Sequence, residues 1–103
     1  MKYWSLVAII LASPTIAIAG APSKEKMEHC TGLSNNAKGI MEARQKGVPM
    51  AKLMTIDSKD KAYNDILAEM VKGAFKVSKY TTDSYQKQAA QDFADQWFAA
   101  CIE

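Results

Sequence analysis

The sequence predicts a small all-α domain, a bundle of three to four helices closed by one disulfide and preceded by a cleavable signal peptide. Apolar residues recur in steps of three and four along the chain, and no segment alternates apolar and polar residues as strands do. Two cysteines lie far apart, at Cys30 and Cys101, and their pairing would close the bundle. A chain of 103 residues has room for a single domain, which we place at residues 20–103.

Residues 1–19 have the features of a signal peptide. Lys2 gives a positive start, an apolar stretch follows, and Ala17-Ile18-Ala19 supplies the small residues that signal peptidase accepts, so cleavage is expected after Ala19. A membrane span needs about 20 mostly apolar residues, and Pro14 interrupts this shorter run. We therefore expect a periplasmic or secreted protein with no stable membrane span after cleavage. An uncleaved signal-anchor is the alternative.

Export would bring Cys30 and Cys101 into an oxidising compartment, where only one pairing is open to them. A link of this length contributes about 4 kcal/mol in the chain-entropy model. The rival interpretation is a reactive thiol beside His29, but adjacent residues on a helix point about 100° apart. His29 is also the only histidine. We therefore expect a structural disulfide, no catalytic residue, and neither a metal nor a cofactor.

The first helix is predicted by a stripe of apolar residues that starts at Met27. Gly32 and the pair Asn35-Asn36 weaken its early part, so a start at Ser34 as N-cap, with Cys30 in a preceding turn, is the alternative. The helix end is marked by Gly47, which suits the left-handed position after a helix. The stripe consists of Met27, Cys30, Leu33, Ala37, Ile40 and Met41.

Three further helices follow from the same periodicity. Pro49 can open a short one that carries Met50, Leu53 and Met54. Asp57 and Ser58 are capping residues for the next, whose stripe is Ala62, Tyr63, Ile66, Leu67, Met70, Val71, Ala74 and Phe75. After a turn at 79–84, with Thr81 or Thr82 as cap, the last helix carries Tyr85, Ala89, Phe93, Trp97 and Cys101 in steps of four, with Ala90, Ala94 and Phe98 beside them.

Charge argues against a nucleic-acid binder. The net charge of the full chain is +2, and without Lys2 the mature chain has 12 basic against 11 acidic residues, interspersed along the sequence. Asp65 and Glu69 share one helix face, which we expect to be solvated. The methionines fall on the helix stripes, which favours core packing. A deformable partner-binding surface or a copper(I) site through thioethers are the alternatives.

Four residues are candidates for contact with a partner. Arg44 and Gln45 could form a recognition patch beside the turn at Gly47, although stabilisation of the helix end is the favoured explanation for both. Trp97 and Phe98 are consecutive on a helix and cannot both point at the centre. One of them is therefore expected at the rim, where a large aromatic side chain can anchor a partner or simply border the bundle.

Three features stand together in the mature chain: Cys30, the Arg-Gln-x-Gly-Val stretch at 44–48, and an aromatic-rich end from Phe93 to Cys101. In these features the chain resembles small signal-peptide-bearing periplasmic proteins of Gram-negative bacteria and of their phages and prophages. That group has no assigned activity, so the resemblance implies periplasmic location and helices without a mechanism. Size, export and one disulfide also give a fainter similarity to the acid-stress chaperones of the enterobacterial periplasm.

The sequence thus predicts, by exclusion, a non-enzymatic periplasmic protein that binds or inhibits another envelope protein. The prediction depends on small size, export, a disulfide and the lack of a convergent polar site. A periplasmic stress chaperone is the first alternative. A membrane-tethered phage regulator that keeps its signal-anchor is the second.

Overall fold

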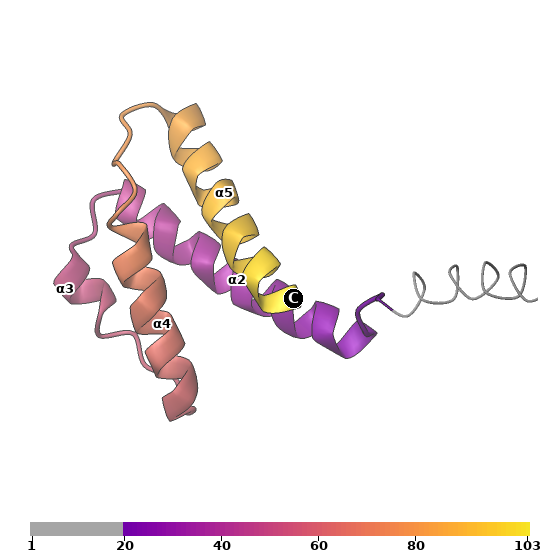
Figure 1. Ribbon diagram of the computed structural model, residues 1–103. Coiled ribbons are helices and arrows are strands. Elements are labelled where there is room, and N and C mark those ends of the chain that lie inside the picture. Colours follow the sequence, from indigo (N-terminus) through magenta and orange to yellow (C-terminus); the bar gives the residue numbers. More distant parts are fainter. Residues whose placement is uncertain (1–19) are drawn as a thin grey trace, which may run out of the picture.

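The computed structural model describes residues 20–103, which fold into four helices (Figure 1). They are α2 (Lys24–Gln45), α3 (Met50–Leu53), α4 (Lys61–Ala74) and α5 (Asp83–Ile102). Within residues 20–103 no strand is present, which confirms the predicted all-α class. The predicted signal peptide lies outside the described residues. In the part of the chain that is described, none of the helices is long and apolar enough to cross a membrane.

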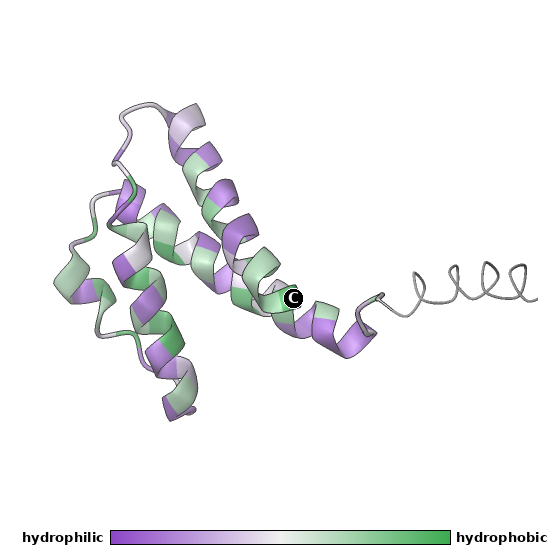
Figure 2. Cartoon of the chain, viewed as in Figure 1, coloured by the Kyte–Doolittle hydropathy of each residue, from purple (hydrophilic) through white to green (hydrophobic). Residues whose placement is uncertain are grey.

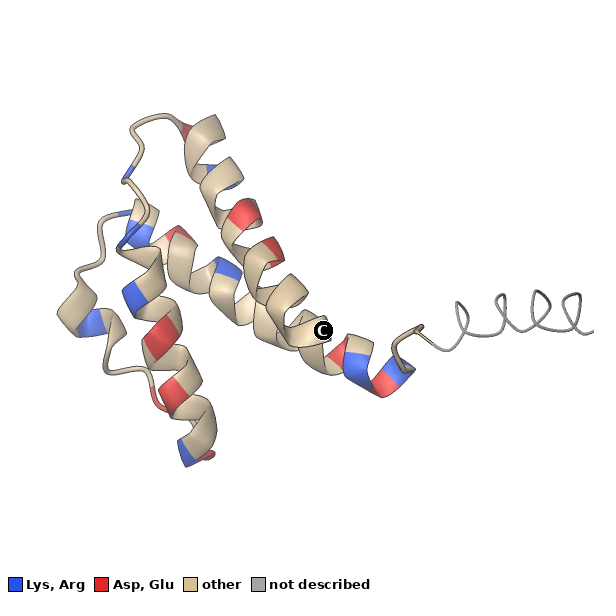
Figure 3. Ribbon diagram, in the orientation of Figure 1, with Lys and Arg blue, Asp and Glu red and all other residues tan. Residues whose placement is uncertain are grey.

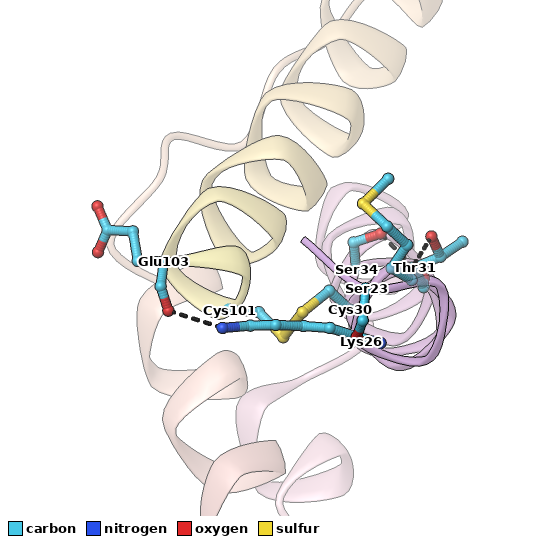
Figure 4. Close-up of a disulfide and its surroundings, with 8 residues drawn as sticks. Ser23, Lys26, Cys30, Thr31, Ser34, Cys101 and Glu103 are labelled. Atoms are coloured by element: carbon cyan, nitrogen blue, oxygen red, sulfur yellow. Dashed lines mark hydrogen bonds between the residues drawn. A yellow bond between two sulfur atoms is a disulfide. The ribbon is translucent and has the colours of Figure 1, made fainter. Parts of the chain in front are cut away.

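The two long helices, α2 and α5, lie antiparallel and are joined by the Cys30–Cys101 disulfide, with 5.6 Å between the Cα atoms (Figure 4). The predicted pairing is confirmed. Beside it, Lys26 Nζ donates a hydrogen bond of 3.0 Å to the backbone oxygen of Glu103. The Cys30 side chain is completely buried. The link therefore lies at the packed contact between the first and the last described helix.

The core forms where α4 and α5 pack against α2. Met41, Met70 and Val71 are its largest fully buried apolar side chains besides Cys30. Gly73 of α4 faces the Phe93 ring of α5, where an added Cβ atom would lie at the ordinary contact distance of 3.4 Å. Figure 2 shows the underlying pattern along α4, where hydrophobic and hydrophilic positions alternate around the helix.

The first helix begins earlier than the Ser34 alternative predicts. Its N-cap is Ser23, whose hydroxyl accepts a hydrogen bond from the Lys26 amide at 3.2 Å, and the helix continues unbroken to Gln45. The weak helix formers Gly32, Asn35 and Asn36 are all exposed. Their small propensity cost is overridden because the opposite face of the helix is buried in the core.

The turn after α2 agrees with its prediction. Gly47 has a φ of 93°, the left-handed region in which glycine carries no Cβ penalty. Val48 then returns to the helix, with its amide donating to the Ala43 carbonyl at 3.0 Å. Pro49 has extended backbone and precedes α3, as predicted.

The N-cap of α4 is Asp60, and the prediction that Asp57 or Ser58 would take this place is wrong. Asp60 Oδ1 accepts hydrogen bonds from the amides of Ala62 and Tyr63, at 3.0 and 3.4 Å. Asp57 and Ser58 instead bind the side chain of Asn64. They fasten the α3–α4 loop to the first turn of α4, which local capping preferences do not reveal.

Tyr85 does not take the buried place that its stripe predicts, since 63% of it is exposed. The same number of residues separates Cys30 from Gln45 and Gln86 from Cys101. In an antiparallel pair Gln86 is therefore level with the last residue of α2, and Tyr85 lies beyond that end. Thr82 is the residue that precedes α5, although its side chain makes no capping hydrogen bond.

The predicted core role of the methionines is confirmed for two of them and is wrong for three. Met41 and Met70 are fully buried. Met27, Met50 and Met54 are about two-fifths exposed, because they lie near the start of α2 and at the two ends of the short α3, where little chain covers them. Asp65 and Glu69 are exposed, as expected.

Removal of the disulfide should lower the free energy of unfolding by about 4 kcal/mol, because the unfolded chain regains the entropy of an open loop. The paired variant Cys30→Ser with Cys101→Ser would be compared with the oxidised domain by urea unfolding. The oxidised domain in reductant should match the variant. Equal urea midpoints for variant and oxidised protein would contradict this account.

Alanine substitutions at two glycines should change stability in opposite directions. Gly47→Ala should destabilise the domain by about 1 kcal/mol, since its backbone has positive φ. Gly32→Ala should stabilise it by about 0.5–1 kcal/mol, because an added Cβ meets nothing within 4 Å in the helix. Thermal unfolding of both variants gives the comparison, and a loss of stability at both positions would speak against it.

Candidate functional site

The Gln45 side chain is buried between α2 and the loop that joins α4 to α5, with 2% of the residue exposed. Its Nε2 donates to the Ser78 carbonyl at 2.9 Å, and its Oε1 accepts from the Tyr80 amide at 2.7 Å. Both ends of the amide are therefore satisfied by loop backbone. Gln45 continues the buried stripe four residues after Met41, a signal that could have predicted its burial.

Arg44, the residue directly before Gln45, contacts the same loop at Val77. Its guanidinium lies 4.5 Å from the centre of the Phe75 ring, and Nη2 donates to the Val77 carbonyl at 3.3 Å. The ring face carries negative charge density and so stabilises the cation without a carboxylate. From the other side, Gln86 Nε2 donates to the Tyr80 carbonyl at 2.7 Å.

The burial of Gln45 contradicts its place in the predicted recognition patch, whereas the part predicted for Arg44 stays a prediction. The Gln45 side chain is buried and its amide is hydrogen-bonded to the loop backbone, so no partner can reach it in this conformation. Arg44 is half-buried against Phe75. Arg44 and Gln45 bind the backbone of Val77, Ser78 and Tyr80, so they do more than stabilise the end of α2.

The loop held in this way borders a groove on α5, which we call the tyrosine groove. It encloses about 360 Å³ and is lined by Val77, Tyr80, Tyr85, Gln88, Ala89, Asp92, Phe93 and Gln96. The rings of Tyr80 and Tyr85 lie at its edge, with centroids 5.9 Å apart and planes tilted by 49°. Buried Ala89 and Phe93 contribute an apolar floor. Sequence reasoning missed this site because Tyr85 was placed in the core.

Trp97 lines a second, more open cleft between α4 and α5, together with Lys72, Gly73 and Lys76. The Trp97 ring contacts Phe93 edge-on, with centroids 6.4 Å apart. Trp97 and Phe98 are both half-buried. The expected rim position therefore describes both side chains.

Between Gly20 and Glu103 no group of three or more His, Cys, Asp or Glu side chains is arranged to hold a metal. His29 is exposed, and Cys30 is consumed by the disulfide, which contradicts the rival interpretation of a reactive thiol.

Comparison with known proteins gives no relative: no protein-family model, curated protein or solved structure matches the chain.

Gln45→Ala should lower the free energy of unfolding by about 2–3 kcal/mol, because it leaves two backbone groups of the loop without partners and opens a cavity. Hydrogen exchange at the Tyr80 amide should accelerate at the same time. Gln91→Ala is the matched control, since Gln91 is exposed and its amide bonds only Asp95 on the same helix. That variant should stay within about 0.5 kcal/mol of the parent. Unchanged exchange at Tyr80 in Gln45→Ala would refute the role of Gln45.

Proposed function

We propose that the mature domain is a non-enzymatic periplasmic binding protein that holds an exposed segment of another envelope protein in the tyrosine groove. The observation that carries the proposal is the exposed Tyr80–Tyr85 pair, in which Tyr80 lies on a loop held by the buried Gln45 and Tyr85 lies in the first turn of α5. The proposal includes an inhibitor, if the bound segment belongs to the partner's own active region.

Exposed tyrosines at a groove fit recognition of a protein. Tyrosine is enriched at binding hot spots because its large ring contributes apolar contact while its hydroxyl can form a hydrogen bond. Among the described residues, neither hydroxyl of this pair is engaged in a hydrogen bond, and Tyr85 is the most exposed of the large apolar side chains. Both polar groups remain ready for a ligand.

The fixed loop supports the proposal on energetic grounds. A flexible loop would lose conformational entropy when it binds, and that loss subtracts from affinity. Here the Val77, Ser78 and Tyr80 backbone is already held by side chains of α2 and α5. Tyr80 is therefore presented in one position before any partner arrives.

A periplasmic location is supported by the disulfide and by the predicted signal peptide. Disulfides persist in oxidising compartments such as the bacterial periplasm and are rare in the cytosol. Because the link joins α2 to α5, the helix that carries most of the tyrosine groove depends on it. Function and compartment are coupled in this way.

Tyr85→Ser should reduce capture of the partner by about tenfold or more, because an aromatic anchor is lost. The measurement uses the immobilised, oxidised domain and periplasmic extract of the source organism, with quantitative mass spectrometry of captured proteins. The double variant Tyr80→Ser with Tyr85→Ser should lose capture entirely.

Met54→Ala is the matched control, since Met54 is an exposed apolar residue outside the tyrosine groove. It should capture as the parent does, and urea midpoints should show that every variant remains folded. Equal capture by the parent and by the double tyrosine variant, or no reproducible partner at all, would sink the proposal.

A further inference from the structure

Asp92 is the one charged side chain among the residues that line the tyrosine groove. Its Oδ1 accepts a hydrogen bond of 2.8 Å from Gln88 Nε2, one turn earlier on α5. Within residues 20–103 the only ion pair joins Lys72 to Glu69, so Asp92 forms none. The groove thus combines two aromatic rings, an apolar floor and one negative charge without a counterion.

The lysines near the groove are directed elsewhere. Lys79 reaches over Gly47, where an added methyl would lie 3.6 Å from its Cε atom. Lys76 lines the cleft with Trp97, and Lys87 lines a hollow on the side of α5 that faces Glu42. Along α5 itself acidic positions outnumber basic ones (Figure 3). The charge of the groove is therefore uncompensated by the domain.

We propose that the groove binds an arginine side chain presented by an exposed segment of the partner protein. This rests on the proposed binding function and names the chemistry of its ligand. A guanidinium can pair with the Asp92 carboxylate and stack on a tyrosine ring, while its aliphatic stem covers the apolar floor. Lysine would fit the charge, but it lacks the planar group that stacks and pairs in this way.

The test is an NMR titration of the ¹⁵N-labelled oxidised domain with two capped heptapeptides. One carries arginine between small residues, and the other carries citrulline, which has the same shape without the charge. The arginine peptide should shift the amides of Tyr80, Tyr85 and Asp92 and bind about tenfold more tightly than the citrulline peptide. Added salt should reduce this difference.

Two variants give the matched comparison. Asp92→Asn should abolish the preference for arginine, whereas Asp95→Asn should keep it. Asp95 is the parallel case on α5, since it accepts the same type of hydrogen bond from Gln91 but lies outside the groove. The inference would be overturned by equal binding of both peptides or by an unchanged preference in Asp92→Asn. It would also be overturned if the groove amides shift with a sugar that can stack on tyrosine, such as tri-N-acetylglucosamine, and do not shift with the arginine peptide.

The two proposals fail in distinguishable ways. If Tyr85→Ser loses the captured partner while Asp92→Asn retains it, the groove binds a protein but not through arginine. If the arginine peptide binds as expected and Tyr85→Ser still captures the partner, the groove recognises arginine but is not the interface.

Discussion

The antiparallel contact between α2 and α5 is the constraint on which the rest of the domain depends. It is fixed at one end by the Cys30–Cys101 disulfide and at the other by Gln45, whose amide binds the loop leading into α5. The short α3 and the smaller contact of α4 could not define the orientation of α5 by themselves. A domain of this size buries limited apolar area, so a covalent link makes a large relative contribution.

The two ends of α2 act on α5 by different means. The disulfide lowers the conformational entropy of the unfolded chain and keeps the two helices together. Gln45 and Arg44 instead determine the local path of residues 77–80. Loss of the first should weaken the whole domain. Loss of the second should act mainly on the loop, and through the loop on the position of Tyr80. Stability and shape of the tyrosine groove are thereby separable properties.

Most of the fold could be predicted from the sequence because its signals are local. Periodicity gave the helices, Gly47 marked the end of α2, and two cysteines leave one pairing. The start of α2 was uncertain because Gly32 and Asn36 have poor helix propensity. The helix starts before them because Cys30 and Leu33 are buried in the tertiary structure. The cap at Asp60 was missed because Asp57 and Ser58 have equally good capping side chains, which the fold uses to bind Asn64.

The candidate site was less predictable because it is made by residues far apart in sequence. No local pattern tells that Gln45 meets Ser78 and Tyr80, more than thirty positions later. The spacing of Gln45 from Met41 could have indicated its burial, which the sequence analysis missed, and its partners follow only from the path of α4. The same antiparallel register carries Tyr85 past the end of α2 and out of the core. Tyr85 continues the apolar period of α5, but it is exposed because α5 extends beyond the end of α2 at this position. Its exposed ring borders the groove there.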